Sequence, residues 1–471
     1  MKKEILKVYK KTVSIGSETP IGIYQALVGE GKGFLLESYD KNYDRYTFIG
    51  CAPRAIVTSG ANSLKVAYRD GTVETRKGNP QTLLKNYYDE FDVERDNENL
   101  PFAGGLVGSI GYDYIRYTEE LPDTNPDTIG VETIALMLVT ECIMIDHFSE
   151  TMTAIILEDP TPEGKIRAEE TAVRLLAGAQ SAQAGEEPAE AVLDGRIMRK
   201  SDTIGEYSEK VEKIKHYIRE GHVFQTVLSQ RWDIETGQSG FDLYRQLRKL
   251  NPSPYLYYFN FEEFEVIGSS PEMLVKKHGG TVTTCPIAGT RPRGKTKEED
   301  RQLTDELLAD EKETAEHVML VDLARNDMGR IAEFGTVKVT EFKSVKYYSH
   351  VMHIVSFVEG IKKEGIHPMD LISSFLPAGT LSGAPKIRAM EIIDELETLR
   401  RGLYGGVCGY LDFSGDMDFC ITIRTMIKVG RMVYLQAGAG IVADSVPENE
   451  YYECCNKVMA LAKTLVKEEH L

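Results

Sequence analysis

The chain has 471 residues, 42% of them hydrophobic and 27% charged, so it can bury one large core or two moderate ones, as an ordinary globular protein does. Its 55 Lys and Arg against 73 Asp and Glu give a formal charge of -18. This acidity argues against nucleic acid or an anionic membrane as the main partner, and an anionic small substrate would need locally placed cations.

Three features predict a soluble, cytoplasmic protein. Seven cysteines, an odd number without a CxxC pair, indicate reduced thiols. The N-terminal MKKEILKVYKKTVS has basic residues but no apolar stretch after them, so we expect no signal peptide. The most hydrophobic run, TIALMLVTECIMID at 133–146, contains Glu141, is too short to span a bilayer and predicts one or two buried strands.

Strand-like runs dominate the chain before residue 177: GFLLES, RYTFIGCAPRAIVTS, LKVAYRD and GLVGSIGYDYI. The segment 177–195, rich in Ala, Gly, Gln and Glu, predicts a linker or exposed loop. A helix is expected at YSEKVEKIKHYIREG, then strands at HVFQTVLSQRWDI, YLYYFNF, EFEVIGSS and MLVKKHGGTVTTCPIA. A long helical region at 298–331, more strands and two helices close the chain.

Strands in runs, rather than in alternation with helices, predict an α+β fold with large antiparallel sheets flanked by helices. We expect two subdomains, residues 1–176 and 196–471, on either side of the linker. FIGCAPR at 48–54 echoes VIGSSPE at 266–272, which leaves open the alternative that the two parts are related.

Two predicted helices carry paired carboxylates. Glu313 and Glu316 are three residues apart and share a helix face, as do Glu450 and Glu453, with Lys457 one turn later. Two such pairs could hold a hard divalent cation, which prefers oxygen ligands. Solvated helix faces are the more common explanation of an isolated ExxE pair.

Three other segments could bind anions. FLPAGTLSGAPK offers free amides around Gly383 and Ala384, with Pro385 at the expected first position of a helix. LQAGAGIVADS lets a ligand approach the backbone from Gly438 to Gly440. Arg424 alternates with apolar residues on a predicted buried strand, where it needs an anion, either a ligand or an internal carboxylate.

GTRPRGKT at 289–296 fits the P-loop pattern GxxxxGK[ST] and offers a nucleotide-binding alternative. A phosphate cradle needs free amides and little bulk, whereas Pro292 has no amide hydrogen and stands between two arginines. VMLVD at 318–322, which would have to be the metal-binding strand, continues a helical pattern. We therefore disfavour an NTPase.

Several segments resemble the chorismate-utilising enzymes, in the order of that family: PIAGTRPRG, AEHVMLVDLARNDMGRI, YYSHVMHIVS, FLPAGTLSGAPK, YGGVCGYLDF, ITIRT and AGAGIVADSVPENEYYE. Anthranilate, aminodeoxychorismate, isochorismate and salicylate synthases share the fold of this family. The resemblance implies a Mg²⁺ site with Glu316 and Glu453 as direct ligands and Glu313 and Glu450 acting through water. It implies chorismate as the substrate.

The resemblance also implies where chorismate binds. The metal would hold the ring carboxylate, with help from Lys457 and from the turn of Thr380, Gly383 and Ala384. The enolpyruvyl carboxylate would be held by Arg424, Tyr404 and the amides of Gly438, Ala439 and Gly440. The remaining contacts are Gln225 and Gly289.

For catalysis, the resemblance implies Glu272 as the general acid for the departing hydroxyl. His353 is assigned to positioning and proton handling, with its neighbour His350 as second choice. Thr290 is the third catalytic candidate.

Two positions favour the anthranilate-forming members. Gln225 stands where the resemblance implies a lysine base in members that add water. Ala288 stands where it implies a lysine nucleophile in aminodeoxychorismate synthase, so ammonia from outside is the expected attacker. Aminodeoxychorismate synthase component I stays the alternative.

The resemblance further implies partners. Ammonia would come from a separate glutamine amidotransferase subunit, in a heterotetramer, because the chain has no GxCxG motif. Feedback inhibition by L-tryptophan is implied at a pocket to which the N-terminal part contributes. Its residues would be Glu37, Ser38, Pro254, Tyr255 and Leu256.

Overall fold

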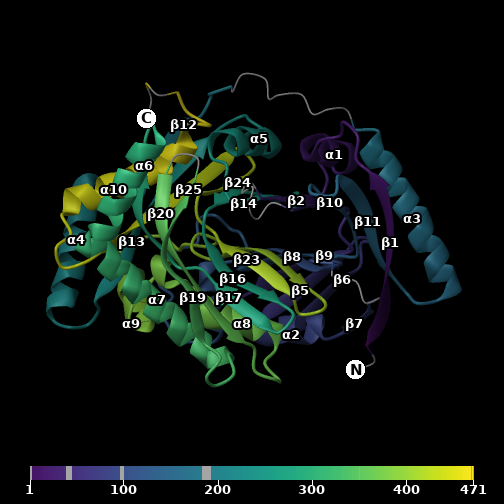
Figure 1. Cartoon of the computed structure of the whole chain (residues 1–471), viewed down its shortest axis with the longest axis horizontal. Coiled ribbons are helices and arrows are strands. Elements are labelled where there is room, and N and C mark those ends of the chain that lie inside the picture. Colours follow the sequence, from purple (N-terminus) through teal and green to yellow (C-terminus); the bar gives the residue numbers. More distant parts are fainter. Residues whose placement is uncertain are drawn as a thin grey trace.

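The computed structural model describes residues 3–38, 45–95, 100–182, 192–348, 351–467 and 469. Two large sheets form its centre (Figure 1). The first contains, in spatial order, β12 (Arg196–Lys200), β13 (Gln225–Glu235), β25 (Met432–Ile441), β24 (Thr425–Val429), β15 (Glu265–Ser270), β14 (Tyr255–Asn260), β2 (Gly33–Glu37), β3 (Tyr46–Cys51), β10 (Glu141–Asp146), β11 (Thr151–Glu158), β1 (Glu4–Ser14) and β7 (Phe91–Glu94), with β21 (Gly383–Ala384) beside β13.

The second sheet contains β18 (Ile287–Pro292), β20 (Val351–Ile361), β17 (Thr281–Thr284), β16 (Met273–His278), β23 (Met417–Ile421), β22 (Val407–Asp412), β8 (Gly105–Ile110), β9 (Ile134–Val139), β4 (Ala55–Gly60), β5 (Ser63–Tyr68) and β6 (Val73–Lys77), with β19 (Lys338–Tyr347) beside β20. The α-helices are α1 (Pro20–Leu27), α2 (Pro80–Tyr88), α3 (Pro162–Gln180), α4 (Ile204–Arg219), α5 (Gly240–Leu250), α6 (Lys297–Ala309), α7 (Glu311–Ile331), α8 (Pro368–Phe375), α9 (Lys386–Leu396) and α10 (Pro447–Ala462). Short 3₁₀ turns lie at Tyr112–Tyr117 and Gly379–Leu381.

The molecule is built in four layers, helices, sheet, sheet, helices. One core packs α1, α3, α5 and α10 against the outer face of the first sheet. A second packs α2, α7 and α8 against the second sheet, and a third, rich in Phe and Tyr, lies between the sheets. The predicted α+β class with large antiparallel sheets and flanking helices is confirmed.

The hydrophobic run at 133–146 forms two strands that belong to different sheets. β9 lies in the second sheet and β10 in the first, and every residue of both strands is buried. Thr140 alone separates them, so the chain crosses between the layers within one residue. Burial on both faces explains why neither strand alternates between apolar and polar residues.

The two halves of the chain repeat one strand order. Outward from the β2–β14 pair, the first sheet runs β2-β3-β10-β11-β1 on one side and β14-β15-β24-β25-β13 on the other. The second sheet likewise runs β8-β9-β4-β5 and β22-β23-β16-β17. FIGCAPR and VIGSSPE end β3 and β15, from which the chain crosses to β4 and β16 in both cases. This correspondence supports the alternative that the two parts are related.

A linker is predicted at 177–195. The sequence before it and the sequence after it both contribute strands to both sheets. α3 continues to Gln180, so the first residues of the expected linker are helical. Residues 183–191 of that segment lie outside the described residues.

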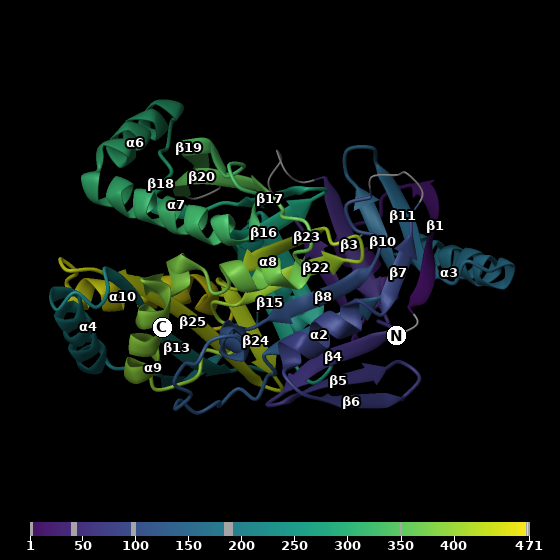
Figure 2. The ribbon, with the colours of Figure 1, turned by 90° about the horizontal axis from the view of Figure 1, so that it is seen from below.

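The C-terminal half adds a lobe of β18, α6, α7, β19 and β20, which in Figure 2 stands with α7 facing α10. The single helical region predicted at 298–331 is two helices, which is a correction. Asp310 ends α6 and begins α7, because its carboxylate accepts hydrogen bonds from the amides of Lys312 and Glu313.

Candidate active site

In the lobe, β18 and β20 bring Thr290 and His353 together. Nδ1 of His353 lies 3.0 Å from the Gly289 carbonyl oxygen and 3.0 Å from Thr290 Oγ1. A carbonyl only accepts, so Nδ1 carries the proton and Nε2 keeps the lone pair. Burial lowers the pKa of His353, with a smaller contribution from the Arg424 charge, which favours the neutral ring. His350 lies outside the described residues.

Gly289 makes room for the first carboxylate pair. It sits at φ +68 in a bulge of β18, and a Cβ there would lie 3.3 Å from Glu313 Oε2. Arg291 Nη1 also reaches Glu313, at 3.4 Å from Oε1. The glycine therefore allows α7 to approach the strand that leads to Thr290.

A hydrogen bond joins the lobe to the first sheet. Gln225, the first residue of β13, donates from Nε2 to Glu316 Oε1 at 3.0 Å. Its amide group lies over Gly440, where a Cβ would come within 2.4 Å of Nε2. The buried Oε1 of Gln225 has no hydrogen-bond partner among the described residues.

Glu272 follows β15 and is buried, with 8% of its surface exposed. Thr380 donates a hydrogen bond from Oγ1 to Glu272 Oε1 at 3.0 Å. Burial raises the pKa of the Glu272 carboxyl to about 8, although the Thr380 hydrogen bond and the Lys457 charge both act to lower it. The side chain is therefore an acid that holds its proton near neutral pH.

Helix α10 presents the second carboxylate pair beside a lysine. Lys457 Nζ lies 2.6 Å from Glu453 Oε1 and 2.9 Å from the Gly438 carbonyl oxygen on β25. A Cβ on Gly438 would lie 3.0 Å from the hydroxyl of Tyr404, so that hydroxyl reaches the same stretch of β25. Ala439, the next residue of β25 after Gly438, is buried.

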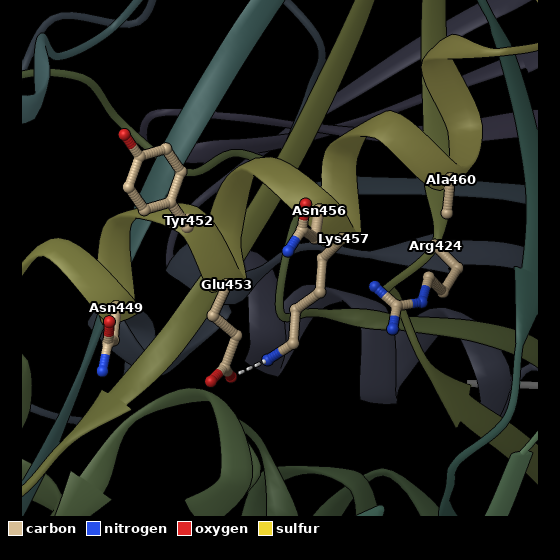
Figure 3. A pocket seen from close by; sticks show the side chains of 7 residues that line it. All are labelled: Arg424, Asn449, Tyr452, Glu453, Asn456, Lys457 and Ala460. Atoms are coloured by element: carbon tan, nitrogen blue, oxygen red, sulfur yellow. Dashed lines mark hydrogen bonds and ion pairs between the residues drawn. The ribbon is translucent and has the colours of Figure 1, made fainter. Parts of the chain in front are cut away.

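Arg424 brings a guanidinium to the site. It lies between β23 and β24, at φ +51, rather than on a buried strand, which corrects the sequence prediction. Within the described ranges, no hydrogen bond or ion pair joins its guanidinium to another residue. It lines a cavity of about 430 Å³ with Glu453 and Lys457 (Figure 3). The structure therefore does not support the alternative in which an internal carboxylate pairs with Arg424.

The turn before α9 pairs directly with the first sheet. Gly383 and Ala384 form β21 and pair with Gln225 and Thr226 of β13. Pro385 is the residue that precedes α9 rather than its first residue, a shift of one position. Gly383 sits at φ +141, and a Cβ there would come within 2.2 Å of the Gln225 carbonyl oxygen, so this close pairing requires glycine.

The P-loop alternative is contradicted by the local structure. The amide of Gly294 donates to Asp300 and that of Lys295 to Glu299, while Thr296 caps α6, so these groups are occupied internally. The segment 318–322 lies in α7, not in a strand.

Sequence reasoning missed some of the residues around this site. Asn449, Tyr452 and Asn456 line the Arg424 cavity. Asn449 and Asn456 lie four and three residues from Glu453, a helical spacing that could have marked them, whereas Tyr452 has no such signal. Arg401 and Glu397 form a buried ion pair beneath the site, and nothing in their local sequence distinguishes them.

A family model described as chorismate binding enzyme matches residues 34–463. The chain belongs to this family. It is 46% identical to an anthranilate synthase component 1 of Acetivibrio thermocellus over 95% of this chain and 93% of the relative. It is 43% identical to that of Thermus thermophilus over 98% of both chains.

Solved structures agree with the family assignment. Anthranilate synthase component I from Streptococcus pneumoniae has a TM-score of 0.80 and 38% identity over 96% of this chain and 99% of that one. The menaquinone-specific isochorismate synthase from Escherichia coli has a TM-score of 0.71 at 19% identity, over 99% and 96%, which shows the shared fold. Among the described residues, the helices include none with the length and apolar character needed to cross a membrane.

In this member of the family, the carboxylates lie in two pairs. Burial raises the pKa of Glu313 and of Glu450, and the neighbouring Glu316 and Glu453 charges raise them further. No three acidic, His or Cys side chains in the described part of the chain converge as a metal-binding group. Four oxygen-donor side chains on facing helices still fit a hard divalent cation in chemistry and charge.

A second cavity, of about 410 Å³, lies between the sheets at the β2–β14 junction. Glu37, Ser38, Pro254, Tyr255 and Leu256 all line it.

The Glu37 carboxylate in this cavity is already engaged. Arg248 donates to it at 2.9 and 3.1 Å, and the Tyr244 hydroxyl donates at 2.5 Å. Any amino group bound there would have to share Glu37 with Arg248.

Proposed function

We propose that this chain is the chorismate-using component of an anthranilate synthase, which converts chorismate and ammonia to anthranilate and pyruvate on the route to tryptophan. The observation that carries the proposal is the joint presence of Arg424, which shares a cavity with Glu453 and Lys457, and of the buried acid Glu272, which feels the charge of the same Lys457. Chorismate offers two carboxylates to bind and one hydroxyl that must leave.

Arg424 holds the enolpyruvyl carboxylate in this proposal. Its guanidinium offers a planar pair of donors that matches a carboxylate, and among the described residues it has no partner to give up. Tyr404, whose hydroxyl reaches Gly438, and the backbone from Gly438 to Gly440 complete that subsite.

Glu272 donates the proton that the leaving C4 hydroxyl needs. Its raised pKa keeps it protonated, and the Thr380 hydrogen bond fixes the orientation of its carboxyl group. Ammonia adds at ring carbon C2 as water leaves C4. The elimination of pyruvate then makes the ring aromatic.

His353 handles protons on the β18–β20 side, where it feels the charge of Arg424. Its Nε2 carries a lone pair because Nδ1 donates to Gly289, and the lowered pKa keeps it neutral. Such a nitrogen can accept the ring proton lost during elimination. Thr290 contacts the same imidazole and orients it.

Glu316 and Glu453 would hold Mg²⁺, with Glu313 and Glu450 acting through water. When bound, the ion supplies positive charge for the ring carboxylate of chorismate, next to Lys457 and the turn of Thr380, Gly383 and Ala384.

Ammonia is the nucleophile because the chain supplies no substitute. Gln225 cannot act as the base that water would require, and Ala288 cannot attack carbon. Relatives named component 1 support a separate glutamine amidotransferase as the source of ammonia. We also propose a cytoplasmic heterotetramer and inhibition by tryptophan bound in the β2–β14 cavity.

The proposal is tested by incubating the purified chain with chorismate, Mg²⁺ and ammonium at a mildly alkaline pH, where free ammonia is present and part of Glu272 keeps its proton, and separating the products. Fluorescent anthranilate is the expected product. Isochorismate, salicylate or aminodeoxychorismate would contradict the proposal.

A further inference from the structure

Arg401 is a buried cation directly beneath the proposed substrate site. It is 2% exposed, and it forms an ion pair with Glu397, which is 7% exposed. Its Nε and Nη2 lie 2.9 and 2.6 Å from the two Glu397 oxygens. Glu397 also accepts hydrogen bonds from the backbone amide and the hydroxyl of Ser229, at 2.9 and 2.7 Å.

Two further donors of Arg401 bond to backbone carbonyls from two distant segments. Nη1 donates to the Leu381 carbonyl at 2.6 Å, and Nη2 donates to the Val227 carbonyl at 2.8 Å. The guanidinium also lies 5.6 Å from the centre of the Tyr404 ring and 4.7 Å from that of Tyr112.

Each contacted segment carries a residue of the proposed site. Leu381 follows Thr380, which orients Glu272. Val227 lies two residues beyond Gln225 on β13, where the short β21 pairing ends. The Val227 amide also donates to the Ser382 carbonyl at 2.9 Å, so the guanidinium adds a side-chain contact beside the last backbone bond between the turn and β13.

We propose that Arg401, held by Glu397, is a positioning residue for the reaction assigned above: it fixes the Gly379–Ala384 turn against β13 and packs against Tyr404. The inference rests on the proposed function. Arginine is needed because its fork reaches Glu397, Leu381 and Val227 at once, whereas a lysine offers a single point. Loss of the fork releases the turn that holds Thr380 on Glu272.

The test compares Arg401→Lys and Glu397→Gln with Arg231→Lys. Arg231 is a matched control because it is also 2% exposed and is paired with Asp233 on β13, while its side-chain hydrogen bonds in the described part of the chain go to Asp233 and Thr128 and not to the turn. Melting temperature, KM and kcat for chorismate, the pH profile and amide hydrogen exchange of residues 379–384 are measured for each. Thr380→Val serves as the reference for a lost Glu272 hydrogen bond.

We expect kcat/KM to fall about a hundredfold in Arg401→Lys, the scale of a small misplacement of reacting groups. The high-pH limb of its rate profile should move upward, as in Thr380→Val, and exchange in 379–384 should rise. Arg231→Lys should lose a similar amount of thermal stability with kcat/KM within about threefold of the wild type.

The proposal is overturned if Arg401→Lys keeps the wild-type pH limb and wild-type exchange in the turn. It is also overturned if Arg231→Lys shows the same losses, or if neither Arg401→Lys nor Glu397→Gln folds, since the pair would then serve stability alone. Wild-type enzyme that makes no anthranilate would instead refute the proposed function, while the exchange data would still test the turn.

Discussion

Glu272 is a carboxyl group that the fold keeps away from water, and we propose that its proton is the one the reaction needs. We expect kcat/KM, measured at a fixed concentration of free ammonia, to fall as pH rises through about 8 because Glu272 then ionises. Glu272→Gln should abolish turnover. A profile without a high-pH limb, or an active Gln variant, would contradict the assignment.

The same group should make stability depend on pH. The folded pKa of about 8 exceeds the ordinary 4.5, so the folded chain retains a proton that the unfolded chain releases between these values. The free energy of unfolding therefore declines as pH rises through that window, by at most about 5 kcal/mol for this group. Glu272→Gln should remove this decline, which chemical denaturation at pH 5 and at pH 9 would detect.

Arg424 offers a second prediction for a single residue. Arg424→Lys should raise KM for chorismate about ten- to hundredfold, because a point charge cannot replace a bidentate fork. The melting temperature should change little, since the guanidinium has no partner among the described residues. An unchanged KM, or a large loss of stability, would show that the arginine serves the fold instead.

Individual residues differ in how far the sequence could identify them. Arg424 could be predicted as an anion partner because an arginine among apolar residues needs one, although its place between strands could not. Arg401 could not be predicted, since its carbonyl partners lie 20 and 174 positions away along the chain. Such contacts exist only once β13, the turn and α9 have packed.

Helices α7 and α10 carry the proposed metal ligands as two pairs on facing elements. Their i,i+3 spacing was predictable from the sequence, as were the existence of both helices and most strands, because apolar periodicity is local. The break at Asp310 was not predicted, since one capping carboxylate outweighed a continuous helical pattern. The distance between the helices depends on how the lobe packs.

Removal of one ligand from either helix should prevent metal-dependent turnover. We expect Glu316→Gln or Glu453→Gln to leave the fold intact but to abolish activity at ordinary Mg²⁺ concentrations. The upward shift in melting temperature given by Mg²⁺ with chorismate should also be lost. Glu311→Gln, at the exposed start of α7, is the matched control. Near-normal activity of either variant at limiting Mg²⁺ would refute the metal assignment.

The chain contains two copies of one structural unit, and the C-terminal copy carries the residues proposed for catalysis. Helices α3 and α10 both begin with Pro-Glu, and in α3 the positions equivalent to Glu450, Glu453 and Lys457 hold Lys165, Ala168 and Ala172. The N-terminal half thus lacks the carboxylates of the C-terminal half. A short sequence echo indicated the repeat, but only the strand order makes it evident.

The cavity at the junction of the halves is the proposed tryptophan site. Strand β20 lines this cavity with Val355 and Phe357 and carries His353 toward the active site, so occupancy of one site can bias the other. Ser38→Phe should fill the cavity and relieve tryptophan inhibition while it spares the uninhibited rate. Wild-type enzyme that is unaffected by millimolar tryptophan would refute this role but not the catalytic one.

The central claim is that one cleft in this chain binds chorismate, adds ammonia and expels pyruvate without a partner subunit. The most direct measurement supplies ¹⁵N-ammonium, Mg²⁺ and chorismate to the purified chain and quantifies the products by mass spectrometry. We predict one ¹⁵N-labelled anthranilate and one pyruvate for each chorismate consumed. A labelled product that retains the enolpyruvyl group, or an unlabelled aromatic product, would contradict the account.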